Sequence, residues 1–271
     1  IPEEETFFQE FVGYCLTTDT SYELAVWLYG PPGSGKSTLI TGIRAMLGSR
    51  AGLLGLAQIQ QSRFALSELP GKTLVTSFEQ PSGMMETNIL NTLISGEPLT
   101  VDRKYREPID FTPKVKVLWA MNERPQTKSA NDGLFRRLAV IPFSAIPEEK
   151  RDKSYKEAVK TEGSGILNWA LDGLERLNKR GRFIIPQTVQ DATANYKSMI
   201  DTPAKFIKEM CALDPEYNEQ SSILYNAFKE WCDENGHEPI SITAIAEDWK
   251  RLGFESYDSN GRRRWRGVQL K

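Results

Sequence analysis

Short apolar runs alternate with helically spaced apolar residues through the first half of the chain. The runs cover residues 24–29, 73–78, 115–121 and 138–143. Runs of this length between helical patterns are typical of strands buried on both faces of a parallel sheet. The pattern therefore predicts an α/β fold with a central parallel sheet.

Helical spacing precedes, separates and follows these runs. Residues 5–16 show it before the first run, and residues 38–47 show it afterwards and end before Gly48, a residue type that favours helix ends. Residues 166–177 repeat apolar positions at the same spacing, and a further helix is expected to begin at Pro186. Strands and helices therefore alternate, as the α/β class requires.

The pattern restarts after Pro203, which disfavours helix in the residue before it. Three helical patterns follow, at residues 206–213, 223–232 and 242–252, and then an Asn-Gly hairpin signal at residues 260–261. Three helices and a hairpin predict a small C-terminal winged-helix domain.

These patterns divide the chain into four expected parts. Residues 1–20 are a helical lead-in, 21–145 the sheet-containing core, 146–201 a helical extension of that core and 202–271 the winged-helix-like domain. The sequence begins with Ile1 instead of Met. We therefore expect the lead-in to continue a region that lies upstream in a longer protein.

Composition mainly excludes classes of function. The net charge of −2 argues against a surface that binds nucleic acid throughout, so any such contact must be local. No apolar run approaches the ~20 residues needed to cross a bilayer, so we expect no membrane association and a cytoplasmic location. Cys15, Cys211 and Cys232 are too scattered for a disulfide framework or a zinc site, and His237 lies in a polar turn.

The strongest chemical signal follows the first apolar run. Glycines allow backbone N–H groups to face phosphates, a lysine neutralises the β and γ oxygens, and a serine hydroxyl holds Mg²⁺. All of these requirements are met by Gly30, Pro31, Pro32, Gly33, Ser34, Gly35, Lys36, Ser37 and Thr38. The sequence therefore predicts ATP and Mg²⁺ as cofactors, with Lys36 as a catalytic cation and Ser37 as a metal ligand.

Polar residues follow two of the other predicted strands. Glu79 comes directly after the run at 73–78, where a carboxylate can polarise the attacking water and help to hold the metal. Asn122 follows the run at 115–121, where an amide can orient that water or sense the γ-phosphate. A surface carboxylate and a turn residue are the alternative interpretations.

Arg136 and Arg137 precede the last run and so lie at the amino end of its strand. This is the wrong end for the chain's own nucleotide if the strand is parallel to the others. The pair suits a neighbouring copy, because an arginine finger given in trans stabilises the charge of the transition state. A solvated basic pair is the alternative.

Two basic segments are candidates for DNA contact. Arg103, Lys104 and Tyr105 lie in an extended stretch, and a hairpin with cations and one aromatic ring can follow a single strand. Beside the Asn-Gly turn lies the strongest basic cluster, which suits duplex or fork DNA and consists of Arg262, Arg263, Arg264 and Arg266. A charged surface hairpin and a solvated edge strand are the alternatives.

Taken together, these residues resemble a superfamily 3 helicase of the phage and plasmid primase-helicase type, a group related to the poxvirus primase-helicase. The resemblance covers nearly the whole chain. Beyond the phosphate loop it rests on residues 64–72 leading to Glu79, 93–105, 122–125, 135–138 with 141–143, and 165–173.

The resemblance implies an AAA+ fold, a ring that is usually hexameric, nucleotide held between subunits and 3'-to-5' movement on single-stranded DNA. It makes Glu79 the Walker B acid, Asn122 the sensor, Arg136 or Arg137 the finger and Lys104 the cation of a pore hairpin. It also implies an upstream primase or primase-polymerase region and a bacterial host cytoplasm.

Other functions stay open from the residues alone. An AAA+ initiator or loader also joins such a core to a winged helix, but uses ATP as an assembly switch with little unwinding. A transcription regulator would read the major groove with residues 242–252, whose Glu247 and Asp248 count against it. A small-molecule kinase would leave the basic C-terminal segment without a purpose.

Overall fold

The computed structural model describes residues 2–271 with the exception of residues 63, 79–83, 86, 128–131 and 153. These residues form two compact units. The first extends to Tyr196, and the second spans Lys197–Lys271. The boundary expected at residues 201–202 therefore falls a few residues inside the second unit.

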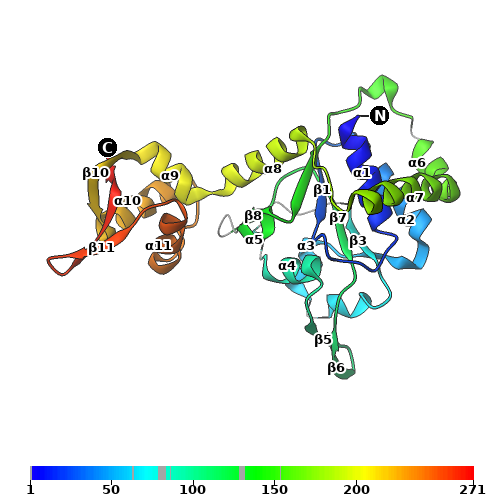
Figure 1. Cartoon of the computed structure of the whole chain (residues 1–271), viewed down its shortest axis with the longest axis horizontal. Coiled ribbons are helices and arrows are strands. Elements are labelled where there is room, and N and C mark those ends of the chain that lie inside the picture. The colour runs from blue at the N-terminus through cyan, green and yellow to red at the C-terminus, as the bar shows by residue number, and fades with distance from the viewer. Residues whose placement is uncertain (1, 63, 79–83, 86, 128–131, 153) are drawn as a thin grey trace. The chain divides into compact units, whose positions relative to one another are not determined.

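The first unit is built on a parallel sheet with the strand order β2-β3-β7-β1-β9 (Figure 1). Its strands are β1 (Ala25–Tyr29), β2 (Ala51–Leu53), β3 (Leu74–Ser77), β7 (Lys116–Met121) and β9 (Leu138–Pro142). The predicted central parallel sheet is confirmed. β2 was not predicted, because three residues with a glycine in the middle are too short to show a pattern.

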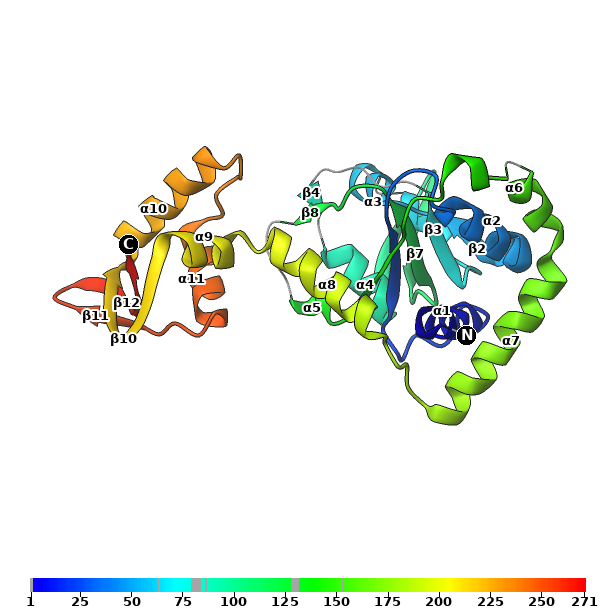
Figure 2. The ribbon, with the colours of Figure 1, turned by 90° about the horizontal axis from the view of Figure 1, so that it is seen from above.

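Two helices cover one face of this sheet, and a third packs against both of them (Figure 2). They are α1 (Glu3–Tyr14), α2 (Lys36–Leu47) and α7 (Gly163–Arg180). Between α1 and α7 the carboxylate of Glu10, which is buried, pairs with Arg176 at 2.7 Å and with Arg180.

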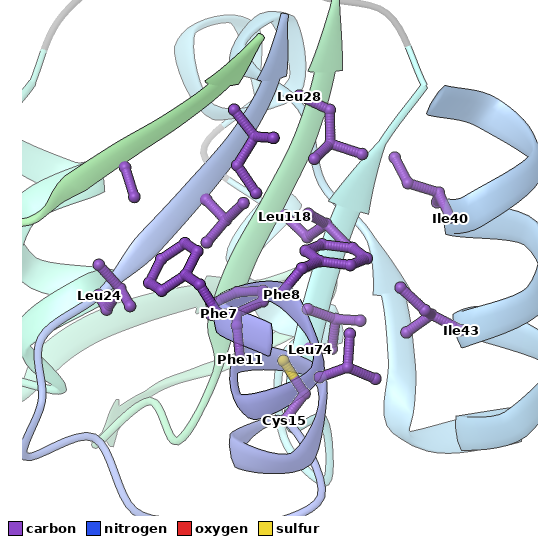
Figure 3. Packing of buried hydrophobic residues seen from close by; sticks show 14 of the residues in the cluster. Phe7, Phe8, Phe11, Cys15, Leu24, Leu28, Ile40, Ile43, Leu74 and Leu118 are labelled. Atoms are coloured by element: carbon purple, nitrogen blue, oxygen red, sulfur yellow. The ribbon is translucent and has the colours of Figure 1, made fainter. Parts of the chain in front are cut away.

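A core cluster lies under these helices. Figure 3 shows Phe7 and Phe8 of α1 beside Leu118 of β7, with Ile40 and Ile43 of α2 on the other side of the cluster. Burial of a large apolar side chain contributes roughly 1.5–3 kcal/mol. The cluster therefore fixes α2, and with it the loop that precedes α2, against the centre of the sheet.

Helix α8 (Gln187–Ile200) covers the opposite face. Side chains alternate between the faces of a strand, so Trp27 points away from the α1 side. Its ring stacks on Trp119 at a centroid distance of 5.8 Å, and Tyr196 of α8 lies 5.6 Å from it. The expected helix after Pro186 is confirmed.

The remaining elements of the first unit are short. Helices and 3-10 turns are η1 (Gly48–Arg50), α3 (Leu56–Gln61), η2 (Ala65–Glu68), α4 (Asn88–Ser95), α5 (Asp132–Phe135), η3 (Glu148–Lys150), α6 (Tyr155–Ala158) and η4 (Val159–Thr161). The two strand pairs are β4 (Met84–Met85) with β8 (Gln126–Thr127) and β5 (Leu99–Arg103) with β6 (Arg106–Phe111). Among the described helices, none has the length and apolar character needed to span a membrane.

The second unit combines helices with an antiparallel sheet of the order β10-β12-β11. In chain order its elements are α9 (Thr202–Met210), β10 (Cys211–Gln220), α10 (Ser221–Glu234), α11 (Ile242–Arg251), β11 (Ser256–Ser259) and β12 (Arg262–Leu270). The hairpin expected at Asn260 and Gly261 is confirmed, with both residues at positive φ.

One expected helix is wrong at its end. The pattern predicted a helix to Leu213, but α9 ends at Met210 and the chain continues as β10. Residues 211–213 instead pair with residues 268–270 of β12. The pairing with β12 completes the sheet, and it outweighs the local helical pattern.

Candidate nucleotide site

The phosphate loop connects β1 to α2 at the carboxyl edge of the sheet. The N–H of Gly30 donates to the carbonyl of Met121, the last residue of β7, at 3.2 Å, and Phe143 N–H donates to Tyr29 at 2.7 Å. These bonds fix the start of the loop between its neighbouring strands. Ligands of open parallel sheets gather at this edge.

Two glycines give the loop its curvature. Gly33 has φ +74° and Gly35 has φ +89°, in the region that side chains other than glycine rarely adopt. Successive N–H groups in such a turn form a concavity that suits an anion. Helix α2 begins at Lys36 directly after this turn, so the positive end of its dipole faces the loop. No acidic residue in the first turn of α2 offsets this charge.

Lys36 is enclosed by the loop and is only 5% exposed. Its Nζ donates to the carbonyls of Gly30 at 2.7 Å and Pro31 at 2.9 Å, and to the Ser34 hydroxyl at 3.0 Å. Desolvation by burial lowers the pKa of the Lys36 ammonium. The ammonium is thus held among acceptors that the oxygens of a phosphate group can replace, and the donor set of the loop fits a nucleoside triphosphate.

The other predicted residues of this edge differ in what the structure describes. Asn122 is exposed and follows Met121, whose carbonyl holds Gly30, so it lies next to the phosphate loop. Ser37, the expected Mg²⁺ ligand, is half-buried at the second position of α2. Glu79 lies outside the described residues, two positions after the end of β3.

Arg136 and Arg137 lie at the opposite edge, because β9 runs parallel to β1. Their surroundings are different. Arg137 is 8% exposed, and its guanidinium donates to Glu23 at 2.6 Å and to the carbonyl of Gly133 at 2.9 Å. Arg136 is exposed. Only Arg136 of this pair is therefore positioned to reach another molecule.

The stretch around Tyr105 forms the hairpin β5–β6, which projects away from the central sheet (Figure 1). Tyr105 is 94% exposed at the turn and has φ +58°. The Lys104 ammonium lies 5.2 Å from the centre of its ring, and Arg103 donates to the carbonyl of Glu107 at 3.1 Å. The tip thus presents an aromatic ring and a cation to solvent.

The arginines of β12 differ in their contacts, and Arg262, Arg263 and Arg266 are exposed. Arg264 donates to Asn218 at 2.7 Å, and the Arg266 guanidinium lies 4.7 Å from the Tyr257 ring centre. Arg262 and Arg263 line a cavity of about 470 Å³. Lys250 of α11 and the first residues of α10 line it too, and sequence reasoning had not linked these segments to the hairpin.

Sequence reasoning also missed Arg151. Its Nε donates to the carbonyl of Ile146 at 2.7 Å, and the Ile146 N–H donates to Gly33 at 3.3 Å. A Cβ added to Gly33 would lie 2.5 Å from the guanidinium carbon of Arg151. No spacing signal in the charged segment after β9 could have predicted this contact with the phosphate loop.

Comparison with known proteins relates the chain to viral proteins that carry helicase names. Residues 28–137 match a family model described as a family of unknown function, DUF5906. A putative helicase of Acanthamoeba polyphaga mimivirus is 27% identical over 249 residues, which is 82% of this chain and 26% of that protein. A putative helicase of Invertebrate iridescent virus 3 is 26% identical over 171 residues, which is 52% of this chain and 18% of that protein. The chain therefore spans only about a quarter or less of the length of these relatives.

The fold is shared with the C-terminal region of NrS-1, whose apo structure has a TM-score of 0.58 to this chain at 14% identity. The superposition covers 97% of this chain and 70% of the other. A second structure of that region gives a TM-score of 0.57 at 13% identity. The chain is thus a distant relative of viral proteins named putative helicases and has the fold of the NrS-1 C-terminal region.

Proposed function

We propose that this chain is the motor region of an ATP-dependent DNA helicase that moves 3'-to-5' on single-stranded DNA. The observation that carries the proposal is the phosphate loop closed around Lys36 at the carboxyl edge of β1. In this proposal nucleotide hydrolysis drives strand separation. The similarity to viral proteins named putative helicases supports this coupling of hydrolysis to strand separation. The resemblance to phage and plasmid primase-helicases supports the polarity and an upstream primase region.

The proposed chemistry divides among the residues at this edge. Lys36 and the loop N–H groups would bind the phosphates, and Ser37 with Glu79 would hold Mg²⁺, which would supply positive charge to neutralise the phosphate oxygens. Asn122, beside the loop, orients the attacking water. Arg136 of a neighbouring copy completes the site, so that the active form is a homo-oligomeric ring, which we take to be a hexamer.

The second unit is proposed to be a winged helix that holds duplex or forked DNA. Its chain order of helix, strand, two helices and a hairpin supports this assignment. The cavity beside the hairpin brings Arg262 and Arg263 near the first residues of α10 and α11. Lys250 lines it as well, paired with Glu247 at 2.8 Å. Cations and helix N-termini together attract a phosphate backbone.

Strand displacement tests this proposal. The full chain is mixed with ATP, Mg²⁺ and a labelled duplex that carries either a 3' or a 5' single-stranded tail. Release from the 3'-tailed duplex alone is expected. Release from the 5'-tailed duplex alone would contradict the polarity. ATP hydrolysis without release from either substrate would favour an initiator or loader that uses ATP as an assembly switch.

Alanine substitutions of the two neighbouring arginines are expected to have different effects. Arg137→Ala removes the partner of Glu23 and is expected to cost about 1–2 kcal/mol of folding stability, a discounted value because Glu23 is partly exposed. Arg136→Ala is expected to leave the melting temperature unchanged and to lower ATP turnover by about 10³-fold. Thermal unfolding and phosphate release measure the two effects.

A mixing experiment shows whether Arg136 acts across subunits. Arg136→Ala and Lys36→Ala chains are each expected to lose most of their turnover, but a mixed ring would contain some interfaces with an intact loop on one side and an intact Arg136 on the other. Partial recovery of turnover on mixing is expected. Wild-type turnover by the Arg136→Ala chain alone would remove the finger assignment.

A further inference from the structure

A short segment after β9 folds back onto the phosphate loop. Ile146 N–H donates to the carbonyl of Gly33 at 3.3 Å, and a Cβ built on Gly35 would meet the Ile146 side chain at 3.7 Å. The 3-10 turn η3 follows and delivers Arg151 to the same loop. We call residues 146–151 the strap. Both ends of the strap therefore touch the phosphate loop of the same chain.

The guanidinium of Arg151 lies against Gly33. A Cβ built on Gly33 would meet its carbon at 2.5 Å and its two terminal nitrogens at 2.7 and 2.8 Å. Its third nitrogen, Nε, is already used, because it donates to the carbonyl of Ile146. The orientation of the side chain is therefore fixed by the strap itself, while its two terminal nitrogens remain at the loop.

The charge of Arg151 has no acidic partner in the part of the chain that the structure describes. The nearby carboxylate of Asp152 accepts instead from the N–H and hydroxyl of Ser154, at 2.8 and 2.6 Å. The loop next to Arg151 is itself positive, because Lys36 lies inside it and α2 starts from it. Cations gathered in this way with no carboxylate among them repel one another until an anion binds.

We propose that Arg151 is a nucleotide-binding residue that contacts the phosphate chain from the Gly33 side of the loop. This rests on the proposed function, and it adds to that function a binding group from the chain's own strap, distinct from the arginine that a neighbouring copy supplies. An arginine fork forms paired hydrogen bonds with phosphate oxygens. The strap thus closes over the nucleotide from the same chain that holds it.

The test compares Arg151→Ala with Lys150→Ala in the full chain. Lys150 is the adjacent exposed cation of η3, so it controls for net charge and for disturbance of the strap. Binding of a fluorescent ATP analogue is measured by titration, and ATP and inorganic tripolyphosphate are used as competitors. Arg151→Ala is expected to lower the affinity for both competitors about tenfold, which is the effect of losing one charge-assisted hydrogen bond at an exposed site. Lys150→Ala is expected to leave both affinities unchanged.

Kinetics and stability separate binding from a purely structural role. Arg151→Ala is expected to raise KM for ATP about tenfold and to change kcat by no more than about twofold. Its melting temperature without nucleotide is expected to equal that of the wild type. Arg151→Lys, which keeps a positive charge, is expected to bind ATP more tightly than Arg151→Ala. Unchanged affinity for ATP would overturn the inference. Weaker ATP binding with unchanged tripolyphosphate binding would overturn it too, since the contact would then be with the nucleoside.

Failure of the inference and failure of the proposed function give different results. If the wild-type chain binds ATP and tripolyphosphate through Arg151 but separates no strands, the helicase proposal is wrong and the role of Arg151 stands. If the chain unwinds DNA and Arg151→Ala binds nucleotide normally, the reverse holds. If the wild-type chain binds neither ligand, both are wrong.

Discussion

Lys36→Ala is expected to lower ATP turnover by about 10²- to 10³-fold, the usual cost of removing one group that stabilises transition-state charge. Lys36 lies inside the phosphate loop, and its ammonium has acceptors at 2.7–3.0 Å that mark where phosphate oxygens bind. Loss of the ammonium leaves the loop N–H groups in place, so weak nucleotide binding persists. Steady-state phosphate release and nucleotide titration measure the two effects.

Truncation also removes the donor that satisfies the carbonyls of Gly30 and Pro31, so the fold must be monitored. Lys36→Met keeps most of the length of the side chain and removes the ammonium, with its charge and its hydrogen-bond donors. Both variants are expected to lose turnover, and circular dichroism of Lys36→Met is expected to match that of the wild type. A Lys36→Met chain that hydrolyses ATP at the wild-type rate would show that this loop is not the hydrolytic site.

The central sheet could be predicted from the sequence because its strands are buried on both faces. Each expected run contains one strand of the sheet, and the ends of the strand lie within one residue of the ends of the run. The run at residues 115–121, for example, contains β7. Strand β10 could not be predicted, because Asp214, Pro215 and Glu216 lie within it and interrupt any strand pattern. Its pairing with β12 has an irregular register between Leu213 and Asn218, which accommodates these residues.

The position of the phosphate loop could also be predicted from the sequence, because its glycines, lysine and serine have a fixed spacing. The difference between Arg136 and Arg137 could not be predicted. They are neighbours of the same type, and the burial of Arg137 depends on Glu23, a residue far away in the sequence. The contact of Arg151 with Gly33 likewise exists only because the segment after β9 turns back over the loop. Such pairings are set by tertiary structure, and a single sequence does not reveal them.

Lys104→Ala is expected to lower the rate of strand displacement at least tenfold and to leave ATP hydrolysis without DNA unchanged. The tip of the β5–β6 hairpin presents Lys104 next to the exposed ring of Tyr105, with their charge and ring centre 5.2 Å apart. A cation held over a ring suits a phosphate beside an unstacked base, and stacking of one base contributes about 1–3 kcal/mol. Phosphate release with and without single-stranded DNA, together with strand displacement, measures the change.

Lys114→Ala is the matched control, because Lys114 is an exposed lysine that follows β6 outside the hairpin. It is expected to unwind at the wild-type rate. Tyr105→Ala is expected to resemble Lys104→Ala if the tip follows the strand by stacking as well as by charge. The hairpin belongs to a different segment from the phosphate loop. If unwinding is lost while hydrolysis stays intact, the substitution has therefore affected the contact with DNA and not the hydrolytic site. A Lys104→Ala chain that unwinds normally would show that this hairpin does not drive the strand.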